Sequence, residues 1–489
     1  MIGMSRLRAL RKHFRFGLRS VLLFVALVGG GAGWLACRID DLHREQAALR
    51  GLTDHETHVH FLYYSEKVHA LDRLPHGIEE WYRTSCDQIS VSGYFYNPDL
   101  GFPWRDAKQQ QTWSVALFLG EHRSHVSYAQ ASDGVALQFL CNNFKWVEVV
   151  DITGAAVTPA DLACLRKLRK LKMVNLDLAS VTDDALAQIG ALANLEWLSL
   201  RYARATSNGL KHLGGLTNLK RLDLDGDYLT GAGLEELRSL KSLQVLTLAG
   251  GDVTDDGLRN LAEMKGLSLL GISCEKISGV GFAKLRGLKG LRLLDLQGCS
   301  IDDVGLACIG ALPALAELSL NGTLVSDDGI GALAGVNVLT ELMLDHTQVS
   351  DKALLSLKCH KGLRRLDLCG TGVGDNDLHG LAELSNLEEL TLGGAHVGDA
   401  ALRELEPLVQ LKRLELDGTN VTDTGLPQIG KLYRLEYLDL ANTTVSDAGL
   451  THILGLQRMR KIALTNTKVT RAGAALLQAA IPAVDVILD

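Results

Sequence analysis

Apolar residues recur in this chain with a period of 24 residues, beginning at Val147. In the copy LKRLELDGTNVTDTGLPQIGKLYR, which starts at Leu411, apolar side chains occupy offsets 0, 3, 5, 10, 15, 18 and 21 from the first Leu. The 14 copies, which follow one another without an insertion, start at Val147, Leu171, Leu195, Leu219, Leu243, Leu267, Leu291, Leu315, Leu339, Leu363, Leu387, Leu411, Leu435 and Met459. Strict self-similarity at such a period is typical of a solenoid, in which each repeat stacks on the next.

Each copy has the pattern of a short strand followed by a helical segment. Offsets 3 and 5 are apolar while offsets 2, 4 and 6 vary, as in a strand with one buried face. Offset 11 is Ser or Thr in 11 copies and offset 12 is Asp in nine, as at Thr254 and Asp255. These residue types cap helix N-termini and suit the positive end of the helix dipole. We therefore assign the Thr-Asp pair to helix capping rather than to calcium binding or catalysis, and offsets 15, 18 and 21 to the buried helix face.

This pattern predicts an α/β solenoid over residues 147–489, a curved horseshoe with a parallel β-sheet on its concave face and helices outside. A single repeat cannot bury its apolar face, so both ends of the stack need a cover. For the first repeat we expect a small α+β cap formed by residues 52–146. At the other end, 475–480 and a terminal strand at 483–488 are expected to form a shortened last turn.

Two segments of the cap region have a clear local pattern. The stretch QTWSVALFLG, at 111–120, has the apolar and β-branched composition of a strand. The stretch SDGVALQFLCNNF, at 132–144, favours a helix capped by Ser132 or Asp133. Five of the six Trp residues lie at or before Trp146, so this region has a composition of its own, which fits a separate cap.

The 24-residue phrase resembles the leucine-rich repeat family. The family's L-x-x-L-x-L core is matched by Leu411, Leu414 and Leu416, and the match recurs throughout 147–489. The second half, VTDxGLxxLxxL, is similar to the subtypes with a helical outer face, such as F-box and ribonuclease-inhibitor repeats. It is less similar to the plant-receptor type with its N-x-x-G-x-I-P turn. The resemblance implies a surface for binding and does not name what is bound.

The N-terminal region has the pattern of a membrane anchor. Residues 1–19 carry six bases and no acid, and residues 20–37 form an 18-residue stretch without a charge. This length is at the short end of what spans a bilayer, and the flanking bases predict a cytoplasmic N-terminus. We expect an uncleaved signal anchor, followed by a helical stalk at 38–51, in a single-pass cell membrane protein with its repeats outside the cytoplasm. A cleaved signal peptide and a lipoprotein modified at Cys37 are the alternatives.

A second resemblance concerns the opening stretch RFGLRSVLLFVALVGGGAGWLACR and the REQAALRGL that follows. It resembles the opening of membrane-anchored leucine-rich repeat proteins of planctomycete bacteria, which supports an anchor over a cleaved signal. Within the span, Gly29 and Gly33 have the GxxxG spacing that lets two helices approach closely, which allows a homodimer. The alternative is that they are only small residues in a glycine-rich span.

Charge and cysteine usage narrow the classes of partner. The net charge of −7 gives no nucleic-acid signature. The nine Cys lack paired zinc spacing; Cys274 and Cys299 lie at similar offsets of adjacent repeats, where a disulfide or two buried thiols are the alternatives. HETHVH at 55–60 allows a metal site or a polar segment. We predict no metal, no cofactor and no enzyme, because no hydrolase, Walker or zinc-protease motif occurs.

The variable offsets 2, 4 and 6 should face the concave side, where acids outnumber bases by 13 to five. An acidic surface favours docking of a basic protein or peptide, whereas a solvated polar face is the alternative. Aromatic residues such as Trp197, Tyr202 and Tyr437 would add contacts. The residues we expect to bind the partner are Asp151, Trp197, Asp223, Asp225, Asp295, Glu341, Asp345, Asp367, Glu415, Asp417 and Asp439.

The sequence therefore predicts a membrane-anchored protein-protein interaction scaffold that binds through its concave face. Two alternatives stay open. One is an enzyme with its activity in residues 52–146, and the other is a structural envelope component that self-associates.

Overall fold

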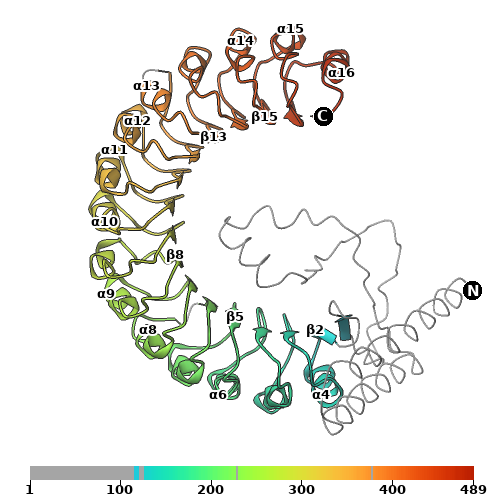
Figure 1. Ribbon diagram of the computed structural model, residues 1–489, viewed down its shortest axis with the longest axis vertical. Helices are drawn as coiled ribbons and strands as arrows, with labels where there is room; N and C mark the ends of the chain where they lie inside the picture. The colour runs from blue at the N-terminus through green and yellow to red at the C-terminus, as the bar shows by residue number, and fades with distance from the viewer. Residues whose placement is uncertain (1–114, 120–125, 227–228, 376–377, 489) are drawn as a thin grey trace, which may run out of the picture. The chain divides into compact units, whose positions relative to one another are not determined.

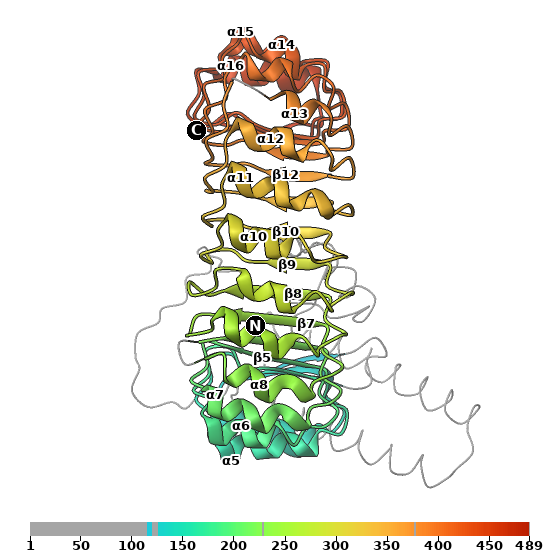
Figure 2. The ribbon, with the colours of Figure 1, turned by 90° about the vertical axis from the view of Figure 1, so that its left-hand side faces the viewer.

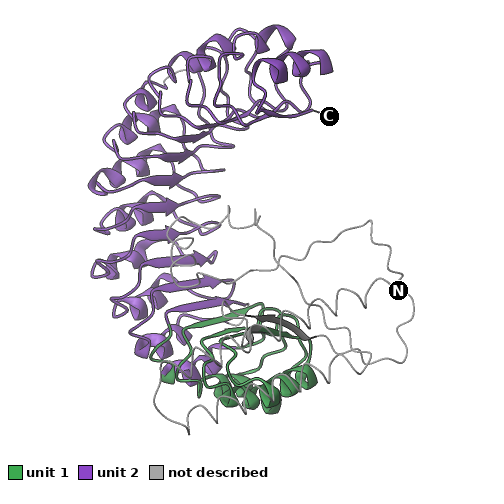
Figure 3. Cartoon of the chain, turned by 45° about the vertical axis from the view of Figure 1, so that its right-hand side comes forward, with its two compact units in different colours: residues 1–205, 215–219 green, residues 206–214, 220–489 purple. Residues whose placement is uncertain are grey.

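The computed structural model describes residues 115–119, 126–226, 229–375 and 378–488. Predictions made for residues 1–114, namely the anchor, the stalk, the GxxxG pair, the His-rich segment and most of the cap, lie outside these described residues. In the described ranges, no helix is both long enough and apolar enough to cross a membrane. The chain divides into unit 1, which comprises residues 1–205 and 215–219, and unit 2, which comprises 206–214 and 220–489 (Figure 3).

In its described residues, unit 1 comprises five strands and a layer of short helices. Strand β1 pairs with β2 in antiparallel fashion, and β2, β3, β4 and β5 are parallel neighbours. The strands are β1 (Val115–Leu119), β2 (Val126–Ala131), β3 (Val149–Asp151), β4 (Met173–Asn175) and β5 (Trp197–Arg201). The helices are α4 (Gly134–Asn143), α5 (Pro159–Leu162), the 3-10 helix η1 (Ala163–Lys167) and α6 (Asp183–Ile189).

The strand and the helix predicted at the end of the cap region are confirmed as β1 and α4. Helix α4 begins after Asp133, whose carboxylate accepts hydrogen bonds from the N–H groups of Val135 and Ala136 at 2.9 and 2.8 Å. Strand β2 was not predicted. It pairs with β3, and Tyr128 lies opposite Val149. Strand β2 and helix α4 therefore form one more turn of the stack before the first 24-residue repeat, and this turn is shorter than those repeats.

Unit 2 is a stack of strand-and-helix turns. Adjacent strands from β6 to β17 pair in parallel, and partners are 24 residues apart, as Leu342 and Leu366 are. Within this unit, the strands line the inner side of the curve and the helices the outer side (Figure 1). The strands are β6 (Arg221–Asp225), β7 (Val245–Ala249), β8 (Leu269–Ser273), β9 (Leu293–Asp295), β10 (Glu317–Ser319), β11 (Glu341–Met343), β12 (Arg365–Asp367), β13 (Glu389–Thr391), β14 (Arg413–Glu415), β15 (Tyr437–Asp439), β16 (Lys461–Ala463) and β17 (Asp485–Ile487).

The helical elements of unit 2 are short and succeed one another along the outer side (Figure 2). Except for the last, they have three to seven residues, because each must fit into one 24-residue turn. They are α7 (Ser207–Leu210), η2 (Lys211–Gly215, of which Gly215 is assigned to unit 1), α8 (Gly233–Glu236), η3 (Leu237–Ser239), α9 (Asp255–Leu258), η4 (Arg259–Leu261), η5 (Val280–Lys284), α10 (Asp303–Ile309), α11 (Asp327–Ile330), η6 (Gly331–Gly335), α12 (Asp351–Leu357), α13 (His379–Ala382), η7 (Ala401–Arg403), α14 (Leu426–Ile429), α15 (Asp447–Leu450) and α16 (Arg471–Ala480).

The periodic apolar positions form the core. In the repeat that starts at Leu339, the apolar side chains at offsets 0, 3, 5, 10, 15 and 18 are at most 1% exposed. Burying each Leu stabilises the stack by about 2 kcal/mol relative to leaving it in water. The last turn also follows the prediction, although α16 starts earlier than expected, because the Thr470 hydroxyl accepts from the N–H groups of Ala472 and Gly473.

The Thr-Asp pair acts differently from the prediction. Offset 11 is the N-cap position in most repeats, but its side chain accepts a capping N–H in only some of them, as at Ser446 and not at Thr254 or Ser326, and the offset-12 carboxylate binds the following repeat. Asp399 accepts from the backbone N–H and the hydroxyl of Thr422 at 2.8 and 2.6 Å. A backbone N–H of the next repeat is bound in the same way by Asp255, Asp303, Asp327, Asp351, Asp375, Asp423 and Asp447, and a hydroxyl is bound as well except at Asp351 and Asp375, whose partners are Gly374 and Gly398. We call these eight carboxylates the aspartate ladder, which ties neighbouring turns together.

Candidate functional site

The strand alternation of unit 2 places offsets 2, 4 and 6 on its inner face. In β12, Leu366 is buried while Arg365 and Asp367 on either side are partly exposed. The same burial pattern holds in β9, β10, β11, β13, β14 and β15. Because paired residues are 24 positions apart, residues with the same offset lie side by side on neighbouring strands. The inner face therefore consists of columns, each formed by the residues of one offset.

The offset-2 column holds ion pairs across neighbouring strands. Arg365 on β12 donates from Nε to Glu389 on β13 at 2.8 Å and from Nη1 to Glu341 on β11 at 3.2 Å. The neighbouring carboxylates raise the pKa of Arg365 above its usual value against the opposing effect of burial. Glu341, one of the expected partner-binding residues, is thus paired within the chain, where it shares the charge of Arg365 with Glu389.

A second basic cluster lies further along this column. Arg413 on β14 donates from Nε to Glu415 at 2.6 Å, and its guanidinium lies 3.9 Å from the centre of the Tyr437 ring. The ammonium of Lys461 lies 5.8 Å from the same ring centre. Burial and the nearby Asp439 raise the pKa of Tyr437 to about 12. Tyr437 is therefore held between two cations, and Glu415 is paired.

Asp223 does not belong to an accessible docking surface. Its side chain is 1% exposed, and it accepts from Nε and Nη2 of Arg221 at 2.7 and 3.1 Å and from the hydroxyl of Thr247 at 2.8 Å. A buried charge is retained where such partners compensate its desolvation. We therefore leave Asp223 out of the binding face, while Asp225 beside it remains partly exposed.

The aspartates at offset 4 share a local role that the sequence reading missed. Each accepts from the backbone N–H two residues later, where the strand turns away, at 2.9 to 3.2 Å. This is the side-chain turn that Asp readily forms. The residues with this contact are Asp151, Asp295, Asp367 and Asp439. One carboxylate oxygen of each thus has a structural role, and in Asp439 the second oxygen also accepts from the Tyr437 hydroxyl at 3.1 Å.

The described chain places no Lys or Arg at ion-pair distance from several inner-face acids, and Asp345 among them contacts the imidazole of His346. Four of these acids lie on or just after strands β11, β12, β14 and β15: Asp345, Asp367, Asp417 and Asp439. We call them the acidic strip. Burial, together with the charges of Asp345 and Glu415, raises the pKa of Asp367 to about 6 against the opposing effects of the Cys369 N–H and Arg365. Burial and Asp439 also raise the pKa of Asp417. These carboxylates repel one another, so a cation placed among them would lower the free energy of the face.

The described residues also bear on the metal and disulfide alternatives that the sequence allows. Among the described residues, no group of three or more His, Cys, Asp or Glu is arranged to hold a metal ion. Cys274 and Cys299 are free buried thiols, so the disulfide alternative for this pair is wrong. Burial and the surrounding acids raise the pKa of Cys369 to about 12, which keeps this thiol protonated and unreactive at neutral pH.

Unit 1 carries the remaining predicted contact residues and one feature that was not predicted. Asp151 and Trp197 are partly exposed on β3 and β5, and Tyr202 is 65% exposed with a φ of +57°. A disulfide joins Cys141 of α4 to Cys164 of η1. Their separation of 23 residues is close to the repeat length, but Cys141 lies outside the 24-residue phrase, so the sequence pattern alone did not align the two.

Comparison with known proteins identifies the fold. No protein-family model and no curated protein matches the sequence. Among solved structures, an internalin from Listeria monocytogenes has a TM-score of 0.50 and 22% sequence identity, over 65% of this chain and 91% of that one. A leucine-rich repeat protein from Leptospira interrogans also has a TM-score of 0.50, with 19% identity, over 71% of this chain and 97% of that one. The fold is therefore that of a leucine-rich repeat solenoid.

Proposed function

We propose that this protein is an interaction scaffold that binds a basic protein or peptide on the inner face of unit 2. Stacked repeats provide an extended surface of side chains held on a rigid sheet, which is how solenoids bind their partners. The inner face carries charged and aromatic side chains, and its described residues include no cluster of His, Cys, Asp or Glu arranged to hold a metal ion. Binding rather than catalysis is the function that this arrangement favours.

The acidic strip is the observation that carries the proposal. Its four carboxylates have no Lys or Arg at ion-pair distance in the described chain, although Asp345 contacts the imidazole of His346. The inner-face bases Arg365, Arg413 and Arg221 pair instead with Glu341, Glu389, Glu415 and Asp223. A Lys or Arg side chain from a partner would relieve the repulsion that raises the pKa of Asp367. The partner-binding residues of the proposal are thus Asp345, Asp367, Asp417 and Asp439, flanked by Tyr437 and by the more distant Asp225 and Asp295.

We further propose that residues 20–37 anchor the protein in a cell membrane, with residues 1–19 in the cytoplasm and the repeats outside it. The uncharged span after six bases supports this orientation. The Cys141–Cys164 disulfide also supports it, because disulfides persist in oxidising compartments. Cleavage of intact cells by an added protease, read with antibodies to the two ends, tests the orientation; a protected unit 2 would contradict it.

Titration of the detergent-solubilised full chain with a labelled peptide of alternating Lys and Ser tests the binding proposal. We expect binding that weakens with salt, and no binding of the matching Glu-Ser peptide. Replacing all four members of the acidic strip by Asn should weaken binding about thirtyfold, because four ion pairs of about 0.5 kcal/mol each contribute about 2 kcal/mol.

The matched control removes four exposed acids from the helix side: Glu236→Gln, Asp256→Asn, Glu263→Gln and Asp328→Asn. It changes the net charge by the same amount and should leave the affinity unchanged. Equal loss in both variants would assign the binding to net charge and contradict a site on the inner face. A wild-type chain that does not discriminate between the Lys and Glu peptides would contradict it as well.

A further inference from the structure

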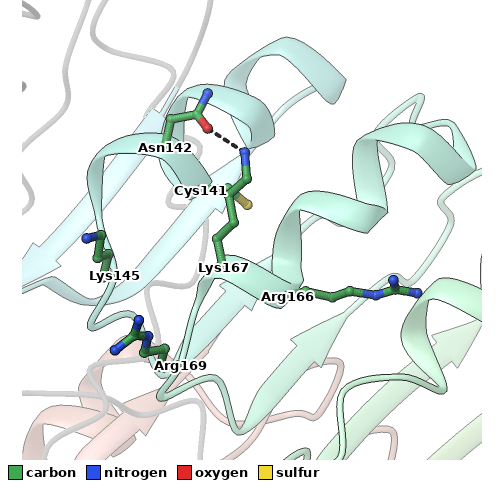
Figure 4. A pocket seen from close by; sticks show the side chains of 6 residues that line it. All are labelled: Cys141, Asn142, Lys145, Arg166, Lys167 and Arg169. Carbon is green, nitrogen blue, oxygen red and sulfur yellow. Dashed lines mark hydrogen bonds between the residues drawn. The ribbon is translucent and has the colours of Figure 1, made fainter.

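A cleft on unit 1 gathers basic side chains, although the whole chain has a net charge of −7. The cleft has a volume of about 400 Å³. Its lining consists of Cys141, Asn142, Lys145, Arg166, Lys167 and Arg169 (Figure 4). The segment 166–172, which reads RKLRKLK, contributes five bases in seven residues. This is a local concentration of positive charge that the proposed binding face of unit 2 does not use.

The fold fixes both walls of the cleft. One wall is the C-terminal end of α4, and the other is η1 with the turn that follows it. Leu168 and Leu171 in that turn are buried, so the bases between and beside them are directed outward. The disulfide between Cys141 and Cys164 joins the two walls. The cations are therefore held at a defined place rather than on a long flexible loop.

Three of the cations that line the cleft have no counter-charge in the described part of the chain. Lys167 Nζ donates to Asn142 Oδ1 at 2.7 Å, and Arg166 Nη2 donates to Gln188 Oε1 at 2.9 Å, so both bind neutral amides. Within the described residues, Arg166, Lys167 and Arg169 have no carboxylate at ion-pair distance. Figure 4 shows Arg166 extending away from the others, so Lys145, Lys167 and Arg169 are the cations nearest the cleft.

We propose that this basic cleft binds a phosphate group. A guanidinium offers two parallel donors to phosphate oxygens, and an ammonium adds a mobile point charge, which together match a phosphate ester. Arg169 supplies the guanidinium and Lys167, whose ammonium donates to Asn142 Oδ1 across the cleft, supplies the ammonium. The site shares no residue with the acidic strip and does not depend on the function proposed for unit 2.

Phosphate groups reach such a site either as soluble esters or as lipid headgroups, and the experiment has an arm for each. The detergent-solubilised full chain is titrated with glycerol 3-phosphate by calorimetry. In parallel, its detergent-depleted form is tested for flotation with phosphatidylglycerol vesicles and with phosphatidylcholine vesicles. The expected anchor would itself bind vesicles. The contribution of the cleft is therefore the difference in flotation between the wild type and variants that keep the anchor.

The test variant is Lys167→Gln with Arg169→Gln, and the matched control is Lys170→Gln with Arg204→Gln. All four residues are exposed on unit 1, and the control pair lies outside the cleft lining, so both variants lose the same charge. We expect the test variant to weaken phosphate binding about tenfold and the control to change it less than twofold.

Loss confined to the glycerol 3-phosphate arm assigns a soluble ester, and loss confined to the phosphatidylglycerol arm assigns a lipid headgroup. Either result supports the phosphate site. Absence of binding in both arms would overturn the proposal, and so would an equal loss in the test and control variants. A melting curve for each variant checks that the folded state is retained, which is expected because the replaced side chains are exposed.

Discussion

The carboxylate of Asp327 accepts both the backbone N–H and the hydroxyl of Ser350, one repeat later, each at 2.6 Å. The contact joins the first turn of α11 to the residue before α12. It recurs through the aspartate ladder, so consecutive turns of unit 2 are linked on their outer side as well as through the sheet. Asp at offset 12 is therefore a connector between repeats.

Replacing Asp327 by Ala should lower the free energy of unfolding by about 2 kcal/mol, because two hydrogen bonds to a charged acceptor are lost and the Ser350 N–H is left without its partner. Denaturant unfolding measures the effect. The control is Asp328→Ala in the same helix turn, where the side chain is exposed and the expected change is within about 0.5 kcal/mol. Equal losses in the two variants would contradict the connecting role.

The glycine at offset 14 makes room for the ladder. A Cβ on Gly449 would lie 2.3 Å from Oδ1 of Asp423, which is closer than any real contact. We expect Gly449→Ala to destabilise unit 2 by about 1–3 kcal/mol, since the Asp423–Ser446 bonds must shift. Gly455→Ala is the control, because a Cβ there meets nothing within 4 Å. Thermal melts of equal midpoint for both variants would refute this role of Gly449.

Asp367 should make the protein less stable at neutral pH than at mildly acidic pH. Its folded pKa of about 6 lies above that of an unfolded Asp, so the folded state binds the proton more tightly. Its contribution to stability is present below about pH 4 and is lost as the pH rises to about 6. Asp367→Asn should therefore raise the free energy of unfolding at pH 7 by about 1–2 kcal/mol.

The comparison of the two proteins by denaturant unfolding at pH 5 and pH 7 isolates this effect. The gain from Asp367→Asn should be smaller at pH 5, where the wild-type carboxyl is already largely protonated. A gain of the same size at both pH values would show that the substitution acts through packing rather than through charge.

His360 occupies offset 21, which is apolar in the other repeats, and is 4% exposed. Its Nε2 has no hydrogen-bond partner, and burial lowers its pKa. With the folded pKa lowered, stability is present above the unfolded value of about 6.5 and is lost as the pH falls below it. We expect His360→Leu to raise the free energy of unfolding by about 1 kcal/mol at pH 7, and by more at pH 5. Unfolding curves at both pH values test this, and a smaller gain at pH 5 would exclude the buried imidazole as the cause.

The repeat made the core predictable, because Leu at fixed offsets admits few other arrangements. The ladder was not predicted, because an N-cap contact within one repeat and a contact 23 residues onward use the same residue types. The acids that form ion pairs could have been predicted by comparing residues of the same offset in successive repeats, because these residues lie side by side on neighbouring strands. Offset 2 runs Glu341, Arg365, Glu389 and Arg413, which alternate in sign on adjacent strands. Burial of Asp223 had no such signal, because it depends on the conformation of Arg221.

Charge reversal in the acidic strip tests the proposed function most directly. The measurement is the ratio of the affinities of the full chain for the Lys-Ser and Glu-Ser peptides, taken at one ionic strength. The wild type should prefer the Lys peptide, and Asp345→Lys with Asp417→Lys should invert the preference, because the same positions would then attract carboxylates. A variant that remains folded and still prefers the Lys peptide by the wild-type ratio would contradict a partner site at the acidic strip.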